Sequence, residues 1–185
     1  MKRQRIEGKN FAEMQSLEED YEGIIFFNCN FSGAKLADVI FFDCEFVQCD
    51  FSMARIKKAS FREVIFKECK MLGLRFDECD TLLLSFNFEQ CILNFSSFHK
   101  LNLRKTTFRA CTLHEVDFSE TDLTQALLDT CDLARATFDQ TILEGCDLRT
   151  AYHFSIDPAN NRLKKARFSK EGLVGLLDKY QLIID

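Results

Sequence analysis

The sequence predicts an all-β solenoid, a fold in which the chain winds into stacked coils around one apolar core. Two observations predict it: a large apolar residue recurs every five positions, and a smaller residue stands two positions before it. A five-residue period fits neither the 3.6-residue period of an α-helix nor the two-residue alternation of a half-buried strand. With 185 residues and 46% hydrophobic content, the chain is long enough for one well-buried core.

The large apolar residues fall in two stretches that differ in phase by two residues, and only Thr81 among them is polar. The first stretch consists of Phe26, Phe31, Leu36, Phe41, Phe46, Phe51, Ile56, Phe61, Phe66, Met71, Phe76, Thr81 and Phe86, and the second of Leu93, Phe98, Leu103, Phe108, Leu113, Phe118, Leu123, Leu128, Leu133, Phe138, Leu143 and Leu148. The phase change is expected after Phe86, as a two-residue bulge near residues 84–91 in which Phe88 turns outward. Such a bulge is either an accommodated insertion or a contact for a partner.

The nine cysteines all occupy the smaller position of the repeat. They are Cys29, Cys44, Cys49, Cys69, Cys79, Cys91, Cys111, Cys131 and Cys146. We expect reduced thiols that point inward and act as small packing groups. A metal site or a chain of disulfides is disfavoured, because stacked coils hold equivalent Cβ atoms about 4.8 Å apart and a relaxed disulfide prefers about 3.8 Å.

Two segments show the repeat most clearly, Cys146-Asp147-Leu148-Arg149-Thr150 and Thr121-Asp122-Leu123-Thr124-Gln125. Each has a small residue, a polar residue, a central leucine and two further polar residues. This pattern resembles the pentapeptide-repeat family over roughly residues 24–150. The resemblance implies a right-handed quadrilateral parallel β-helix, the pentapeptide-repeat solenoid, in which four repeats make one coil and about six coils stack.

The spacing of the cysteines agrees with a twenty-residue coil, since Cys29, Cys49 and Cys69 are twenty residues apart. At the same spacing, one stacked column of rings is expected to contain Phe26, Phe46, Phe66, Phe86 and Phe108. Residues 1–23 are expected to form an N-terminal cap or an irregular first coil, because the end of a solenoid exposes unpaired strand edges.

The C-terminal segment, residues 151–185, breaks the period and predicts a turn, a short helix capped by Ser169 and an apolar tail. In the Qnr-type quinolone-resistance proteins and their mycobacterial relative, a C-terminal helix pairs two rods end to end, and this segment resembles that element. The resemblance implies a homodimer through the C-terminal end. The expected contact residues are Leu173, Leu176, Leu177, Tyr180, Leu182 and Ile184. The alternative is a cap that folds only onto its own chain.

Charge is distributed unevenly, although the net charge is only −5. Between Glu115 and Asp147 there are nine acidic residues and one basic residue, Arg135. The candidate acidic interaction surface consists of Glu115, Asp117, Glu120, Asp122, Asp129, Asp132, Asp139 and Asp147. The resemblance implies DNA mimicry directed at DNA gyrase. A basic stretch in the middle coils, from Arg55 to Arg75, does not fit a rod that is negative along its whole length.

The sequence therefore predicts a non-enzymatic protein-interaction module whose partner is unknown. The alternative is a DNA mimic that binds DNA gyrase or another topoisomerase and modulates quinolone sensitivity. Direct binding of nucleic acid is disfavoured by the net negative charge. The only histidines are His99, His114 and His153, and the first two lie in outward positions of different repeats without a carboxylate at a recognisable spacing. No phosphate loop, metal-ligand cluster or nucleophile motif is present, so no enzyme, cofactor or metal is expected. No signal peptide or membrane-spanning stretch is evident, and a cytoplasmic location is expected.

Overall fold

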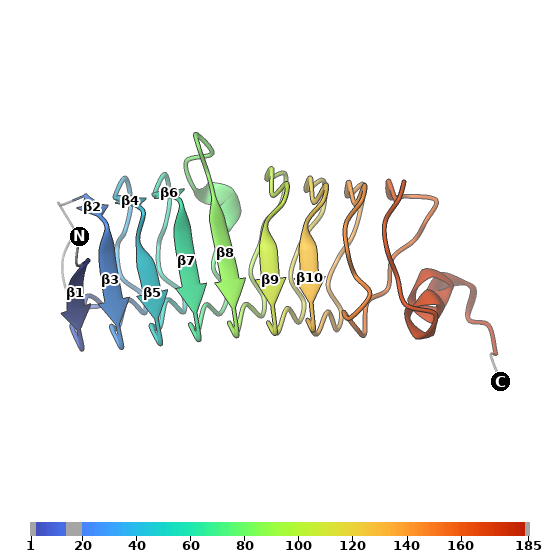
Figure 1. Cartoon of the computed structure of the whole chain (residues 1–185), viewed down its shortest axis with the longest axis horizontal. Coiled ribbons are helices and arrows are strands. Elements are labelled where there is room, and N and C mark those ends of the chain that lie inside the picture. The colour runs from blue at the N-terminus through green and yellow to red at the C-terminus, as the bar shows by residue number, and fades with distance from the viewer. Residues whose placement is uncertain (1–2, 14–19, 184–185) are drawn as a thin grey trace.

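The chain forms a long rod of stacked coils (Figure 1). The computed structural model describes residues 3–13 and 20–183. One side of the rod, which we call face 1, is a seven-stranded parallel sheet in the order β1, β3, β5, β7, β8, β9, β10. Its strands are β1 (Gln4–Glu7), β3 (Ile24–Phe27), β5 (Glu45–Val47), β7 (Val64–Lys67), β8 (Phe86–Glu89), β9 (Thr107–Arg109) and β10 (Leu127–Asp129). Face 4 carries the three-stranded parallel sheet of β2 (Tyr21–Glu22), β4 (Ile40–Phe42) and β6 (Ser60–Arg62).

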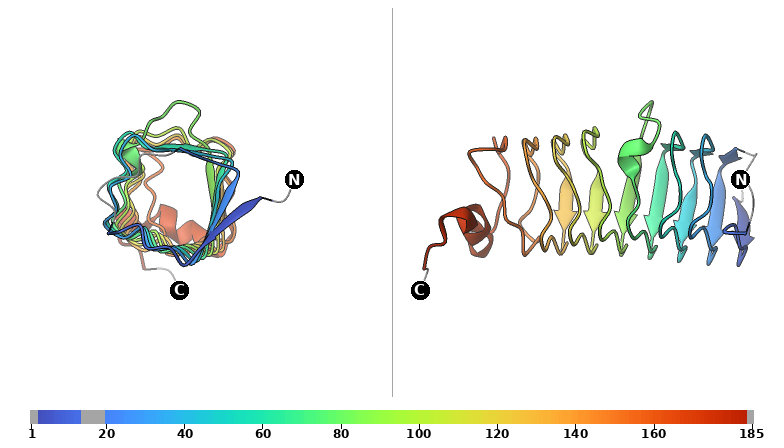
Figure 2. Two further views of the ribbon diagram at one scale, coloured as in Figure 1. Left: turned by 90° about the vertical axis from the view of Figure 1, so that its left-hand side faces the viewer. Right: turned by 180° about the vertical axis from the view of Figure 1, so that it is seen from behind.

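The remaining two sides are held by single parallel bridges between neighbouring coils. Face 2 follows face 1 along the chain and contains the bridged series Asn10, Asn30, Asp50, Lys70, Ile92, Thr112, Asp132 and Tyr152. Face 3 contains the bridge between Lys35 and Arg55 and the bridged series Arg75, Ser97, Asp117 and Thr137. Seen along the rod, the four faces form a square (Figure 2). The predicted right-handed quadrilateral parallel β-helix is therefore confirmed.

Each repeat turns the chain two residues after its central apolar residue. The backbone there is left-handed, with φ of 51° at Asn28, 59° at Lys58 and 56° at Glu120. The polar residue before the centre stabilises this turn: the carboxylate of Asp117 accepts a hydrogen bond from the backbone N–H of Ser119 at 2.8 Å. Asp50 does the same for Ser52 at 2.8 Å. The recurrence of Asp and Asn at this position therefore has a structural cause.

The interior is filled by columns of stacked side chains. The ring of Phe46 lies between those of Phe26 and Phe66, with centroid distances of 4.7 and 5.1 Å. All nine cysteines are buried and none forms a disulfide, which confirms their inward position. The thiol of Cys49 donates to the carbonyl of Phe26 in the preceding coil at 3.5 Å. Burial raises the pKa of the Cys44 thiol to about 11, so this thiol is a neutral packing group.

The two-residue slip lies before Phe86, whereas the sequence pattern placed it after that residue. Ser60 pairs with Asp80 twenty residues later, but Val64 pairs with Phe86 twenty-two residues later. The extra residues therefore lie in the loop Thr81–Ser85. Thr81 is exposed, so its assignment as a central interior residue was wrong.

The aromatic column of face 1 runs through Phe88 instead of the predicted Phe86. Phe88 stacks on Phe66 and on Phe108, with centroid distances of 5.3 and 5.0 Å. The side chain of Phe88 is 1% exposed, so the predicted outward turn was wrong. Phe86 is also buried, but it occupies the smaller position opposite Val64.

The coils continue beyond residue 150, where the repeat pattern fades. Arg162 bridges Ile142 and Arg167 bridges Asp147. Two short 3-10 helices, η2 (Glu171–Leu176) and η3 (Asp178–Tyr180), then lie against the C-terminal end of the rod (Figures 1 and 2). The predicted short helix is thus present in 3-10 form, and the Ser169 hydroxyl accepts a hydrogen bond from the N–H of Gly172 at 2.9 Å. A third 3-10 turn, η1 (Phe76–Glu78), lies on face 3.

Candidate functional site

The inward residues of the rod are committed to packing, so any function is carried by residues that face outward. Among the described residues, no group of three or more His, Cys, Asp or Glu side chains is arranged to hold a metal ion. Three outward features depart from the regular repeat: a projecting loop, the C-terminal end and the distribution of charged residues.

The loop Thr81–Ser85 projects from face 4 just before β8 (Figure 1). Leu82 and Leu83 at its tip are 63% and 69% exposed. The backbone of Leu83 is left-handed, with φ of 59°, and the carboxylate of Asp80 accepts a hydrogen bond from the N–H of Leu82 at 3.0 Å. The loop is thus held in a defined conformation that presents two leucines to solvent.

A groove of about 370 Å³ runs beside this loop. Its lining includes Leu83, Leu84 and Phe42, and the ring of Phe42 is 37% exposed. Leu84 is half-buried and packs against the core, so it anchors the loop from below. The loop and the groove together form an apolar surface on a face whose other outward residues are mainly polar. The sequence pattern placed a candidate partner contact at residues 84–91 but did not identify the two tip leucines, because it counted Thr81 and Phe86 as regular interior positions.

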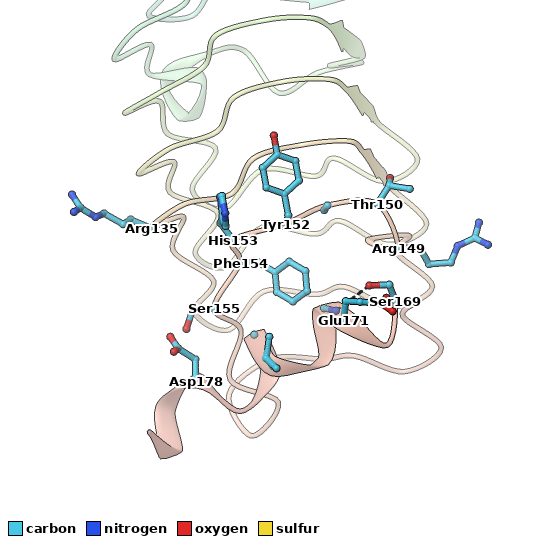
Figure 3. Close-up of a pocket in the computed structure, with 14 residues that line it drawn as sticks. Arg135, Arg149, Thr150, Tyr152, His153, Phe154, Ser155, Ser169, Glu171 and Asp178 are labelled. Atoms are coloured by element: carbon cyan, nitrogen blue, oxygen red, sulfur yellow. Dashed lines mark hydrogen bonds between the residues drawn. The ribbon is translucent and has the colours of Figure 1, made fainter. Parts of the chain in front are cut away.

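The C-terminal end contains a larger groove, of about 820 Å³, between the last coil and η2 (Figure 3). The ring of Phe154 lies in it, with Tyr152 and His153 toward the coils and Glu171 and Asp178 on the helical side. Phe154 packs so closely under η2 that a Cβ atom at Gly175 would lie 2.3 Å from the Phe154 carbonyl oxygen. Glycine is therefore the residue that lets η2 close over the end of the core.

The residues expected to make a dimer contact divide into two groups. Leu176 is half-buried and packs against the core of its own chain. The exposed residues are Leu173 at 47%, Leu177 at 38%, Tyr180 at 58% and Leu182 at 58%. Ile184 lies outside the described residues. The C-terminal segment is thus a cap on its own chain that also presents an apolar outer surface.

The eight residues of the candidate acidic surface are spread around the rod. Face 1 carries Asp129 and Asp147, face 2 carries Glu115 and Asp132, face 3 carries Asp117, Glu120 and Asp139, and face 4 carries Asp122. Most of them form ion pairs with basic residues of neighbouring coils or repeats. The pairs join Glu115 to Arg135, Glu120 to Lys100, Asp122 to Arg104, Asp129 to Arg109, Asp132 to His114 and His153, and Asp147 to Arg149 and Arg167.

Two members of the acidic set, Asp117 and Asp139, make no ion pair with any described residue. Asp139 accepts a hydrogen bond from the side-chain amide of Asn160. The negative charge that the sequence concentrates between Glu115 and Asp147 is therefore largely balanced by ion pairs, and most of the cations lie just before or just after this segment in the sequence.

The histidines do have carboxylate partners, contrary to the expectation from the sequence. Asp132 lies between His114 Nε2 and His153 Nδ1, each 2.9 Å from a carboxylate oxygen. Burial opposes ionisation of Asp132, but its close contacts with the two histidines outweigh it and lower the pKa of this carboxyl. The two histidines are 18 and 21 residues from Asp132, close to the twenty residues of one coil. A search for carboxylates about one coil away from each histidine would therefore have identified them.

Basic residues without partners gather on face 3 in the N-terminal half of the rod. Lys35, Arg55, Lys57 and Lys58 are exposed, and none of them forms an ion pair within the described chain. Arg75, one coil further on, is paired with Asp77 at 2.6 Å. This cluster is therefore a group of positive charges without ion-pair partners on the part of the rod that the structure describes.

None of the helices among the described residues is long and apolar enough to cross a membrane.

A solved structure shows the same fold, and a second one matches more weakly. A trypsin-treated variant of QnrB1, described as a plasmid-mediated fluoroquinolone resistance protein, matches with a TM-score of 0.65 at 18% identity, over 99% of this chain and 98% of that chain. HetL, a pentapeptide repeat protein involved in heterocyst differentiation regulation in Nostoc sp. strain PCC 7120, matches with a TM-score of 0.40 at 15% identity, over 91% of this chain and 88% of that chain. No curated protein sequence matches the chain.

The family model for pentapeptide repeats matches residues 24–62, 44–80 and 111–149, which together make up over half of the chain. The match agrees with the square coils, the left-handed corners and the stacked interior columns of the structure. The chain belongs to the pentapeptide-repeat family.

Proposed function

We propose that the protein is a non-enzymatic interaction module that binds a protein partner through the loop Thr81–Ser85. The observation that carries this proposal is the exposure of Leu82 and Leu83 at the tip of the loop. The backbone of Leu83 has the left-handed conformation that other corners of the rod share, so the tip of the loop is held in a defined position. An exposed apolar protrusion with a fixed backbone is the form of a contact residue that enters a pocket on a partner.

The neighbouring surface supports this role. Phe42 and Leu84 line the groove beside the loop, so the apolar contact area extends beyond the two tip residues. Arg62 lines the same groove and is paired with Asp80 at 3.7 Å. A partner would thus meet a leucine tip, an apolar groove and a polar rim, the arrangement that protein interfaces use.

Affinity capture from cells that express the protein tests this role, with the variant L82S/L83S and the control Met53→Ser. Met53 is a matched control because it is 68% exposed with φ of 58°, close to the values of Leu83, and it lies on a different corner. The expected result is a saturable partner that wild type and M53S retain and L82S/L83S loses. Equal retention of the same partner by all three proteins would contradict the role of the loop.

A second candidate function is a DNA mimic that binds DNA gyrase and modulates quinolone sensitivity. The fold that this chain shares with QnrB1 along nearly its whole length supports this candidate. The charge distribution restricts it to the C-terminal half, where the acidic residues lie, because Lys35, Arg55, Lys57 and Lys58 make the N-terminal half of face 3 basic. A basic groove on the enzyme would attract that half through long-range electrostatics.

A supercoiling assay with purified gyrase, with and without a fluoroquinolone, tests the second candidate. Inhibition or protection by wild type should be weakened in D117N/D122N/D129N, in which Asn retains the turn hydrogen bonds of residues 117 and 122. Asp50→Asn is the control, because Asp50 makes the same turn hydrogen bond in the N-terminal half. A wild-type protein without effect on supercoiling at high micromolar concentration would rule the candidate out.

We also infer that two rods can pair through their C-terminal ends. Leu173, Leu177, Tyr180 and Leu182 support this pairing because they remain exposed after η2 and η3 have closed the core. The variant L173D/L177D should lower the sedimentation coefficient of a C-terminal dimer to that of a monomer. The control is Ile92→Asp, since Ile92 is 42% exposed and stands where the repeat commonly carries Asp. A wild-type monomer at all concentrations would contradict the pairing.

A further inference from the structure

Face 3 presents its charges in straight columns along the rod. One column consists of the residues that precede each centre: Lys35, Arg55, Arg75, Ser97, Asp117 and Thr137. Bridges join Lys35 to Arg55, and Arg75 through Ser97 and Asp117 to Thr137, and the backbone hydrogen bond from Lys58 N to Glu78 O connects the two segments. A second column consists of the corner residues Asp38, Lys58, Glu78, Lys100, Glu120 and Gln140. The backbone hydrogen bonds from Lys58 N to Glu78 O and from Lys100 N to Ser119 O place these corners next to one another.

Face 3 is basic at one end and acidic at the other. Lys35, Arg55, Lys57 and Lys58 lack an ion pair within the described chain, and so do Asp117 and Asp139 at the opposite end of the same face; Asp38 is an unpaired acid at the basic end. On the other faces, most acidic residues of the C-terminal half have a cation within 4 Å. Apart from Asp38, the unpaired charges of opposite sign on face 3 lie too far apart along the rod to meet within a single chain, and Glu120 and Glu78 between them are paired with Lys100 and Arg75 of their own chain.

A second copy of the face, reversed in direction, would bring these charges together. A two-fold axis across face 3, between the levels of Glu78 and Lys100, sets Lys58 opposite the Glu120 position, Glu78 opposite Lys100, and Arg55 opposite Asp117. A third column, formed by the residues directly after each centre, lies between these two. In it, Lys57 is opposite Ser119 and Asp77 is opposite His99. No two like charges face each other in this register. We propose that face 3 is an interface at which two copies of this chain pack side by side and antiparallel.

The size of the face predicts a weak dimer. Six coils at a spacing of about 4.8 Å give a strip roughly 30 Å long and only one repeat wide. Such a strip buries less area than the interfaces of stable dimers, and most of its contacts are between charged residues that water screens. The association should therefore be reversible at micromolar protein concentrations and should weaken as salt is added.

The proposed pairing is separate from the contacts described above. In Figure 2, the short helix η1 identifies face 3, and the loop Thr81–Ser85 projects from another side of the square, face 4. The loop therefore remains available to a partner in the side-by-side dimer. The C-terminal contact lies at the end of the rod, whereas the two-fold axis proposed here crosses its middle. Variants at one contact leave the residues of the other unchanged.

Reciprocal charge reversal at Lys58 and Glu120 tests the proposal. Lys58→Glu places two carboxylates opposite each other, and Glu120→Lys places two ammonium groups opposite each other, so each variant alone should have a dissociation constant raised by more than about tenfold. An equimolar mixture of K58E and E120K restores both opposite-charge pairs in a heterodimer. Lys105→Glu is the matched control, because Lys105 is an exposed corner residue of face 4 with φ of 63° and no ion pair in the described chain.

Sedimentation velocity at low and at high salt is the measurement. The expected result is an association of wild type and K105E at low salt that is lost at high salt, whereas the apolar C-terminal contact does not depend on salt in this way. K58E and E120K alone should associate weakly through face 3, and their mixture should recover the association. Thermal unfolding of each variant checks that it is folded. A wild-type protein that stays monomeric at low salt would overturn the proposal. So would a mixture that fails to associate, or a dimer that persists in K58E and is lost only in L173D/L177D.

Discussion

The ring of Phe66 stacks on the ring of Phe88, twenty-two residues later, with centroids 5.3 Å apart and planes 9° from parallel. All other steps of the column from Phe26 to Phe108 span twenty residues. The column is therefore continuous across the slip, and the extra residues leave the core through the loop Thr81–Ser85. Core packing fixes where an insertion can be accommodated in this rod.

Replacing Phe88 by Ala should remove a ring that is in contact with Phe66, Phe76 and Phe98 at once. The expected loss in free energy of unfolding is about 3–5 kcal/mol, the range for a buried phenylalanine. Equilibrium denaturation in urea measures it. Phe95→Ala is the control, since Phe95 is 57% exposed and should cost less than about 1 kcal/mol. Equal losses for the two variants would contradict the placement of Phe88 in the core.

Deleting Leu82 and Leu83 together should leave the fold intact. The deletion returns the spacing between Val64 and Phe86 from twenty-two residues to the twenty of the other coils. It also removes the left-handed leucine, so we expect the free energy of unfolding to change by less than about 1 kcal/mol. Circular dichroism and urea denaturation check the fold, and the capture experiment checks the function. A deletion variant that unfolds would show that the loop supports the coils.

The interior of the fold could be predicted from the sequence, because each buried position recurs at a fixed spacing. The slip could not be placed, because Phe86 and Phe88 are chemically identical and each fits one of the two phases. Burial of both rings, in different positions of the repeat, resolved that ambiguity. A two-residue shift that begins at Thr81 instead of Phe86 satisfies the same pattern of apolar residues.

The charge balance was misread for a different reason. Counting charges between Glu115 and Asp147 follows the chain, whereas ion pairs form between neighbouring coils. Arg109 pairs with Asp129 and Arg162 with Glu144, which are 20 and 18 residues apart. Both cations lie outside the counted segment. In a solenoid, the side chains that lie next to a charged residue are often one coil away in the sequence. A charge count over consecutive residues therefore overstates the net charge of the surface that they form.

Gly175→Ala should loosen the C-terminal cap. The added Cβ would lie 2.3 Å from the carbonyl oxygen of Phe154, which is backbone and cannot move aside without shifting the last coil. We expect a loss of about 1–3 kcal/mol in the free energy of unfolding, as for other overpacked sites. Gly172→Ala is the matched control in the same 3-10 helix, because its nearest contact is the edge of the Phe154 ring at 3.1 Å.

Faster amide hydrogen exchange in η2 would show that the cap has opened in G175A. The control G172A should keep slower exchange there, because a ring edge can yield by a few tenths of an ångström. If G175A kept the exchange rates of wild type, this result would contradict the close contact between the Phe154 carbonyl and η2.

The stability of the protein should fall in acid in part through Asp147. Hydrogen bonds from the Arg149 guanidinium, together with the charge of Arg167, lower the pKa of this carboxyl below its usual value of about 4. A carboxyl whose pKa is lower in the folded state stabilises the fold above its unfolded pKa, and this stabilisation disappears as the pH falls through the folded pKa. Asp147→Asn keeps an acceptor for Arg149 but does not titrate.

The urea midpoint of wild type should therefore exceed that of D147N at about pH 6, and the two should converge as the pH falls well below the usual carboxyl pKa of about 4, where Asp147 becomes protonated. Glu22→Gln is the control, since Glu22 is an exposed acid without an ion pair in the described chain. Its midpoint should follow that of wild type across the whole range. If D147N lost as much stability in acid as wild type does, the ion pairs of Asp147 with Arg149 and Arg167 would contribute nothing to the fold. The acid sensitivity would then have to come from other carboxylates, such as Asp132 between its two histidines.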